Sequence, residues 1–189
     1  MQTTLIIHAH PRPRQSTATR ALLDALAARP DTAVRSLYER YPDFDIDVAS
    51  EQEALTHAQL VIWVAPVYWY SVPALLKHWF ELVLAHGWAY GKGGDALQGK
   101  TAWWVASAGG MATMYQPGGA HMRPFADFVA PIEHTARYCG MHWLPPYVLH
   151  GGHKLAPDQL AAAVAALGAQ ADRHVAALPR PAPTAQAPA

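Results

Sequence analysis

The sequence predicts a single α/β domain, built around a doubly wound, mostly parallel sheet of five strands with helices on both faces. The chain has 189 residues, which is enough for one well-buried α/β domain and short for two. Five short apolar segments alternate with segments of helical periodicity, the pattern of repeated βαβ units. Right-handed crossovers leave few topologies for such a sheet, and 2-1-3-4-5 is the common order for five strands.

The expected strands are short runs rich in aliphatic and β-branched residues. The clearest is the run 60–64, which is apolar on both faces, as a buried strand of a parallel sheet must be, and Pro66 ends it. The first strand ends in the loop that contains His10, and the fourth is followed by a pair of glycines. The five expected strands cover residues 5–7, 34–38, 60–64, 101–107 and 143–149.

The expected helices are recognised by their caps and by apolar residues at helical spacing. Ser16 and Thr17 can cap the first helix, which ends before Pro30, and Asp47 can cap the second. Pro73 suits the first turn of the third. Two more helices are expected at residues 125–138 and 157–178. The domain thus covers residues 1–178, and the Pro/Ala-rich tail 179–189 is expected to be disordered.

The charge of the chain excludes two classes of function. It contains 14 basic and 14 acidic residues, so its formal net charge is zero and its pI is near 7.2. Nucleic-acid binding is not expected, because it needs a basic face. An acidic electron carrier, which docks by long-range charge attraction, is not expected either. The eleven histidines are scattered without a metal-binding motif, so no metal site is predicted.

The sequence favours a cytoplasmic location. Residues 1–4 lead directly into an apolar strand, without the basic and long apolar regions of a secretory signal. The longest apolar run, around residues 60–66, is far shorter than the roughly 20 residues that span a bilayer. Cys139 is the only cysteine, so no internal disulfide can form, and we expect it to be a small buried hydrophobic residue.

Three loops carry the unusual residues, and the predicted topology brings them together. They cover residues 8–19, 66–73 and 107–121, after the first, third and fourth strands. In doubly wound sheets, ligands bind outside the carboxyl ends of the strands at the topological switch point. The first of these loops lacks a glycine-rich nucleotide motif, but it places hydroxyl groups at a helix N-terminus, which suits either a single phosphate or ordinary capping.

The other two loops suggest a flat ligand and proton donors. Tyr68, Trp69 and Tyr70 are consecutive aromatic residues that either pack a core or cover a flat ligand. The glycines at 109 and 110 let the backbone approach a ligand closely. Tyr115 and His121 are candidate proton donors, or else incidental residues of a flexible loop.

The chain resembles the NAD(P)H:quinone oxidoreductases, a family of flavodoxin-like flavoproteins. The resemblance covers the chain to about residue 150 and continues weakly to about 178. The stretches that carry it are AHP at 9–11, SLY at 36–38, YPDF at 41–44, EQEAL at 51–55, WYS at 69–71, HGWAYG at 86–91, YCG at 138–140 and WLPP at 143–146.

The resemblance implies a flavin site on the three loops, with FMN as cofactor, FAD as the alternative, and NAD(P)H and a quinone as substrates. It places the flavin phosphate at His10, Ser16, Thr17, Ala18 and Thr19, and the isoalloxazine along Val67, Tyr68, Trp69 and Tyr70. It places the pyrimidine edge at Ser107, Ala108, Gly109 and Gly110, and it makes Tyr115 and His121 the pair that assists hydride transfer. Three positions depart from the family pattern: Ser107 and Ala108 replace two threonines, and Tyr68 replaces a common glutamine.

The resemblance also implies partners. Members of the family form homodimers in which each site is closed by the partner chain. Candidate contacts here are Trp88, Tyr90 and the aromatic face near Trp79 and Phe80, although simple core packing would also explain them. One branch of the family regulates a glutathione-gated potassium:proton antiporter. The alternative function is therefore a regulatory subunit that binds and activates such an antiporter at the inner face of the membrane, with secondary redox activity.

Overall fold

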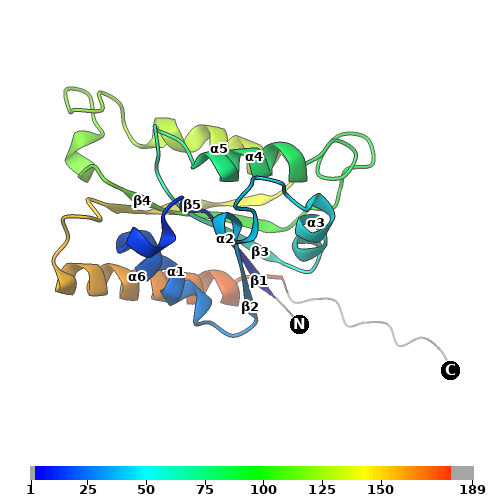
Figure 1. The fold of residues 1–189 in the computed structure, drawn as a ribbon, viewed down its shortest axis with the longest axis horizontal. Helices are drawn as coiled ribbons and strands as arrows, with labels where there is room; N and C mark the ends of the chain where they lie inside the picture. The colour runs from blue at the N-terminus through cyan, green and yellow to red at the C-terminus, as the bar shows by residue number, and fades with distance from the viewer. Residues whose placement is uncertain (1–2, 180–189) are drawn as a thin grey trace.

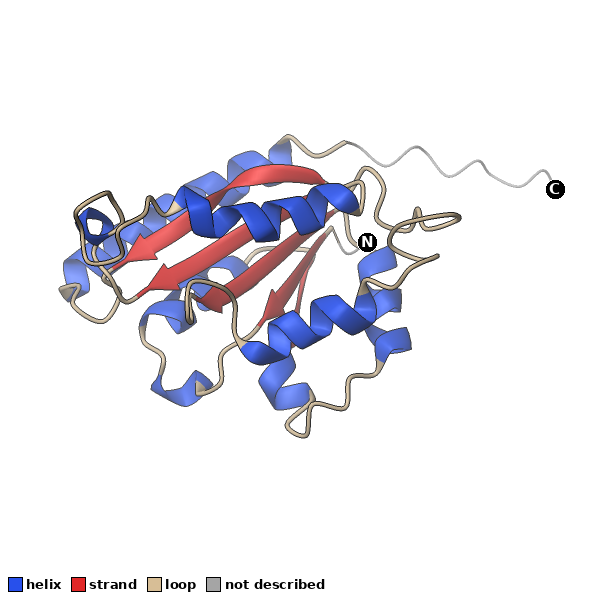
Figure 2. Cartoon of the chain, turned by 90° about the horizontal axis from the view of Figure 1, so that it is seen from above, coloured by secondary structure: helices blue, strands red, loops and turns tan. Residues whose placement is uncertain are grey.

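The computed structural model describes residues 3–179 and has one sheet of five strands at its centre (Figure 1). All the strand pairs are parallel, and the order is β2-β1-β3-β4-β5. The strands are β1 (Thr4–His8), β2 (Thr32–Ser36), β3 (Leu60–Pro66), β4 (Thr101–Ala108) and β5 (His142–His150). The predicted fold class and strand order are confirmed, and all carboxyl ends of the strands lie at one edge (Figure 2).

Helices cover both faces of the sheet (Figure 1). On one face lie α1 (Ala18–Ala27) and α6 (Pro157–Ala176). On the other lie α3 (Val48–Thr56), α4 (Ala74–Val83) and α5 (Ala126–Tyr138). The short helix α2 (Leu37–Arg40) follows β2, and two 3-10 turns, η1 (Pro13–Gln15) and η2 (Ala112–Met114), lie in the loops after β1 and β4.

The alternation of side chains along the strands divides the core in two. On β1, Ile6 packs with one buried cluster while Leu5 and Ile7 pack with the other. The first cluster lies under α1 and α6, and the second lies under α4 and α5. Because both faces are covered, β1, β3 and β4 are buried along their whole length, as their apolar sequences require.

The chain after β2 differs from the prediction. The expected strand 34–38 ends at Ser36, and Leu37 begins a short helix instead. The Leu37 side chain is completely buried, and its carbonyl accepts the N–H of Tyr41 at 2.8 Å. Leu37 and Tyr38 are aliphatic and aromatic, as strand residues often are, so only the packing of Leu37 separates the two alternatives.

A buried carboxylate attaches α3 to the rest of the domain. Glu51 is 0 % exposed and accepts hydrogen bonds from Arg35 Nε at 2.7 Å, the Tyr41 hydroxyl at 2.6 Å and Trp79 Nε1 at 3.0 Å. These partners come from β2, the end of α2 and α4. A fully buried charge needs such pairing. The predicted cap of the same helix is confirmed, since Asp47 Oδ1 accepts the Ser50 N–H at 3.0 Å.

Two further expectations concern the C-terminal tail and membrane-spanning helices. Of the expected tail 179–189, all but Pro179 lies outside the described residues. Within residues 3–179, no helix combines the length and the apolar character that crossing a membrane requires.

Candidate cofactor site

The N-terminus of α1 presents unused backbone donors at the carboxyl edge of the sheet. The first helical hydrogen bond runs from the N–H of Ala21 to the carbonyl of Thr17. The N–H groups of Ala18, Thr19 and Arg20 therefore precede the helical hydrogen bonds and have no acceptor among the described residues. The predicted cap, Thr17, makes no side-chain capping bond. Free N–H groups at the positive end of a helix dipole favour an anion.

His10 is held beside these donors in a defined tautomer. Its ring is buried, and Nδ1 accepts the backbone N–H of Arg12 at 3.0 Å. Burial lowers the pKa of His10 below its ordinary value of 6.5, which favours the neutral ring. A neutral ring whose Nδ1 accepts must carry its proton on Nε2. His10 therefore offers one N–H donor beyond its own loop.

A buried hydroxyl pair joins the first loop to the end of β4. The side-chain oxygens of Thr19 and Ser107 are 2.7 Å apart, and both residues are buried. One hydroxyl donates to the other, so the accepting hydroxyl keeps a free O–H that could donate to a ligand. Residues 88 positions apart are thus fixed against each other at the centre of the predicted site.

A cavity of about 420 Å³ lies between these loops, a size typical of small-ligand sites. Most of the predicted cofactor-contacting residues line it: His10, Ser16, Thr17, Ala18, Thr19, Val67, Tyr68, Ser107, Ala108 and Gly109. Of the other predicted residues, Trp69, Tyr70, Gly110, Tyr115 and His121 lie outside this lining. The structure therefore brings residues of all three loops around one cavity, while Trp69, Tyr70 and the two candidate proton donors lie outside its lining.

A fourth segment, which sequence reasoning missed, completes the cavity. Gly152, His153 and Leu155 follow β5, and Leu160 is in α6. Their signal is the pair Gly151-Gly152 directly after a strand, the same pattern that marked Gly109 and Gly110. The N–H of Gly152 donates to the Ala108 carbonyl at 3.2 Å, which ties the end of β5 to the end of β4.

The loop after β3 contains a strained two-residue turn. Tyr68 and Ser71 exchange backbone hydrogen bonds of 3.0 Å in both directions, so Trp69 and Tyr70 form the turn. Both turn residues have positive φ, 48° and 64°, as in a type I′ turn that normally contains Asn or Gly. Trp69 is 92 % exposed, and Tyr68 and Tyr70 are also exposed. The alternative that these three residues pack a core is therefore wrong.

Tyr115 and His121 converge on Gly110. Their rings stack with centroids 4.2 Å apart. A Cβ placed on Gly110 would lie 2.7 Å from His121 Nε2 and 3.2 Å from the Tyr115 hydroxyl. Among the described residues, the buried Nε2 of His121 has no hydrogen-bond partner, and burial raises the pKa of Tyr115 above 10. The two polar groups are thus held together at the glycine pair after β4 rather than dispersed on a flexible loop.

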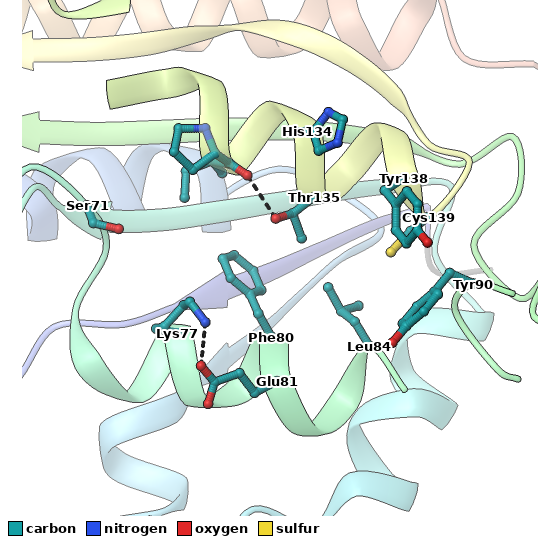
Figure 3. A pocket seen from close by; sticks show the side chains of 12 residues that line it. Ser71, Lys77, Phe80, Glu81, Leu84, Tyr90, His134, Thr135, Tyr138 and Cys139 are labelled. Carbon is teal, nitrogen blue, oxygen red and sulfur yellow. Dashed lines mark hydrogen bonds and ion pairs between the residues drawn. The ribbon is translucent and has the colours of Figure 1, made fainter. Parts of the chain in front are cut away.

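A second and larger cavity lies between α4 and α5. This groove of about 550 Å³ is lined on one side by Lys77, Phe80 and Leu84, and on the other by Thr135 and Tyr138 (Figure 3). Most of its lining comes from helix interiors, where backbone N–H groups are already bonded, so it lacks the phosphate-binding features of the smaller cavity. Cys139 also lines it and is buried as expected, which raises the pKa of its thiol.

Two of the residues proposed for a dimer contact pack within the domain instead. Trp79 is completely buried and donates to Glu51, and Phe80 is 7 % exposed and contacts Trp63. The alternative of core packing therefore holds for Trp79, whereas Phe80 is almost buried but also lines the groove. Tyr90 is partly exposed and lines the groove. Within residues 3–179, no three His, Cys, Asp or Glu side chains are grouped to hold a metal ion.

A protein family described by its flavodoxin-like fold matches residues 2–173. The chain belongs to this flavodoxin-like family. The family resemblance inferred from the short sequence stretches is also supported at the level of whole sequences. A glutathione-regulated potassium-efflux system ancillary protein KefF from Enterobacter sp. (strain 638) is 48 % identical over 146 residues, which cover 77 % of this chain and 82 % of that protein.

Two solved structures are similar to this chain over almost their whole length. General stress protein 14 from Treponema denticola, solved in complex with FMN, is 37 % identical, with a TM-score of 0.85 over 90 % of this chain and 98 % of that one. A protein from P. pentosaceus described as an NADPH-quinone reductase is 31 % identical, with a TM-score of 0.80 over 89 % of this chain and 97 % of that one.

Proposed function

We propose that this protein is a flavin-dependent oxidoreductase that transfers two electrons, as hydride, from NAD(P)H to a quinone, with FMN as its cofactor. The observation that carries the proposal is the cavity between the free N–H groups of α1 and Gly109 after β4. FMN needs an anion site for its phosphate and a stretch of backbone that its flat ring system can approach closely. The FMN complex of general stress protein 14 and the NADPH-quinone reductase from P. pentosaceus support it.

The donors of the site fit FMN. Three backbone N–H groups of α1 and the Nε2 of His10 are available for the phosphate. At the other end, the buried Nε2 of His121 has no partner among residues 3–179 and lies close to Gly110. A buried polar atom without a partner is costly unless a ligand satisfies it. The exposed Trp69 and Tyr70 would lie along the flat ring system, as the resemblance implies.

FMN, when bound, carries the two-electron chemistry between the reduced nicotinamide and the quinone. The chain supplies position and electrostatic stabilisation. The N–H groups at Gly109 and Gly110 offer fixed dipoles for negative charge that develops on reduction. The Tyr115 hydroxyl and His121 Nε2 converge on the same point and are placed to hold or donate a proton there.

The first experiment identifies the cofactor. The purified protein is expected to be yellow, to release a flavin with the mass of FMN, and to reduce a soluble quinone with NADH or NADPH. Thr17→Asp places a negative charge at the α1 N-terminus and should weaken FMN binding at least about tenfold. Thr56→Asp, at the exposed end of α3, is the matched control. A colourless protein that takes up no added FMN would overturn the proposal.

The second experiment tests the proton donors. Tyr115→Phe combined with His121→Gln should slow reduction of bound FMN by about 10²-fold, the usual contribution of general acid catalysis, while FMN stays bound. Stopped-flow absorbance of the flavin measures this step directly. An unchanged reduction rate would remove the role assigned to the pair.

We also propose that two copies associate through the face that contains the α4–α5 groove. Tyr138 is 66 % exposed at the end of α5, and its ring lies 5.2 Å from that of Tyr90 across the groove (Figure 3). Leu82 on α4 is also exposed. Exposed apolar side chains gathered around a groove are typical of a protein interface.

A second function has its own support. The similarity to potassium-efflux ancillary proteins favours binding and activation of a glutathione-gated potassium:proton antiporter, which would hold the protein at the inner face of the membrane. Co-purification with such an antiporter and faster potassium efflux from vesicles that contain it would support this function. Quinone turnover by the isolated protein, with no effect on efflux, would support the enzyme alone.

A further inference from the structure

The end of β5 holds the loop that contains Tyr115. The N–H of Gly151 donates to the Gly110 carbonyl at 3.0 Å, and Gly152 bonds the Ala108 carbonyl. Met111 packs against Gly151, and its sulfur would have to shift if this glycine carried a Cβ. The first residues of the loop 109–121 are therefore hydrogen-bonded to the residues that follow β5.

One side chain of β5 reaches further into this loop. The His150 ring lies 5.2 Å from the Tyr115 ring and 5.1 Å from the Phe125 ring, centroid to centroid. Phe125 contacts Tyr115 as well, edge to face at 5.0 Å. His150, Phe125, Phe128 and the stacked His121 together surround the Tyr115 ring, and of these four only His150 belongs to the sheet.

The chemistry of His150 suits packing rather than proton transfer. Its Nδ1 is buried and has no hydrogen-bond partner among the described residues. Burial lowers the pKa of the ring and outweighs an opposing interaction with the Gly110 backbone, so the neutral form is favoured. A neutral ring between aromatic neighbours acts through its shape and contacts. A rigid strand is also a better support for a reacting group than a loop is.

We propose that His150 is a positioning residue, which holds the Tyr115 hydroxyl against Gly110 through ring contacts. This inference rests on the proposed function, because it assumes that Tyr115 assists reduction of the flavin. Displacement of a reacting group by about 1 Å can lower a rate by as much as 10²-fold, so a support of this kind should be visible in the kinetics.

The test measures the rate at which NADPH reduces bound FMN in the holoenzyme, by stopped flow. His150→Ala should lower this rate at least about tenfold and leave the dissociation constant of FMN unchanged. His150→Phe, which keeps a ring and removes the unpaired Nδ1, should stay within about threefold of the wild type. His142→Ala is the matched control, since His142 is exposed at the opposite end of the same strand.

A double-mutant cycle separates positioning from general damage. If His150 acts through the Tyr115 hydroxyl, adding His150→Ala to Tyr115→Phe should cause no further loss of rate. Effects that multiply in the double variant would overturn the inference, as would His150→Phe being as slow as His150→Ala, or a wild-type rate in His150→Ala. If neither NADPH nor NADH reduces the wild-type flavin, the proposed function is wrong, and the inference is then lost because it rests on that function.

Discussion

At the scale of single residues, Gly110 has no room for a side chain. Its missing side chain lets His121 Nε2 and the Tyr115 ring approach to within about 3 Å of where a Cβ would lie. The neighbouring Gly109 is different, because its Cβ would meet His153 at 3.6 Å, an ordinary contact. Two adjacent glycines therefore have different physical reasons to be glycine.

Gly110→Ala should displace His121 and Tyr115 and slow reduction of bound FMN by about tenfold or more. The added methyl group should also destabilise the fold by about 1–3 kcal/mol, the usual effect of overpacking. Stopped-flow reduction and urea unfolding measure the two effects. Gly109→Ala is the control and should change neither by much; equal effects of the two variants would contradict this interpretation.

The buried His8 should make stability depend on pH. It is 3 % exposed, with Nδ1 3.0 Å from the Ser36 hydroxyl. Burial, aided by the nearby His10, lowers its pKa from 6.5 to about 4. Between these values the unfolded chain binds a proton that the folded chain does not bind. Full stability is therefore present above pH 6.5, and about 3 kcal/mol is lost as the pH falls to 4.

His8→Gln removes this titration. The free energy of unfolding of the variant should fall less than that of the wild type between pH 7 and pH 4.5, by about 2–3 kcal/mol. Urea titrations at the two pH values measure the difference. His142→Gln, a change at an exposed histidine, should follow the wild type. If the free energy of unfolding depends on pH equally in the wild type and in His8→Gln, His8 has the same pKa in the folded and unfolded chains.

At the scale of elements, the turn after β3 is strained and leaves an aromatic ring exposed. Non-glycine residues at positive φ cost about 1–3 kcal/mol each. Trp69 gains almost no packing in return, since it is 92 % exposed. Strain of this kind often lies at a ligand site. Contacts between the proposed flavin and the Trp69 ring would offset the free energy of this backbone strain.

Trp69→Asn should therefore raise the free energy of unfolding of the apoprotein by about 1 kcal/mol and weaken FMN binding. Met122 offers the matched control, because it also has positive φ, 55°, and is 74 % exposed. Met122→Asn should stabilise the apoprotein similarly but leave the FMN affinity unchanged. Thermal unfolding and FMN titration measure the pair, and weaker FMN binding in both variants would argue against a specific role of Trp69.

At the scale of the whole molecule, the two faces of the sheet are covered differently. On one face α1 and α6 pack together, with Arg29 bonded to Asp172 at 2.9 Å. On the other, α4 and α5 leave the groove of about 550 Å³ between them (Figure 3). The face with the groove is therefore where we expect a second copy.

The protein should have the mass of a dimer by light scattering at micromolar concentration. Tyr138→Glu places a charge beside the groove and should shift the equilibrium toward the monomer, because an uncompensated charge is costly to bury. Val175→Glu, at a partly exposed position on the opposite face, should leave the dimer intact. A monomeric wild type would remove the proposal of a shared face.

The sequence by itself determined the alternation of strands and helices, the parallel sheet and the convergence of three loops, because periodicity, caps and crossover handedness are local or topological rules. The resemblance predicted phosphate contacts at His10 and residues 16–19, and the structure shows that these residues line one cavity. Only the tertiary structure decided that Leu37 begins a helix, that Trp79 turns inward to Glu51, and that His150 and His153 reach the site from β5. These outcomes depend on contacts between residues far apart in the chain, whose burial and pairing no local pattern encodes.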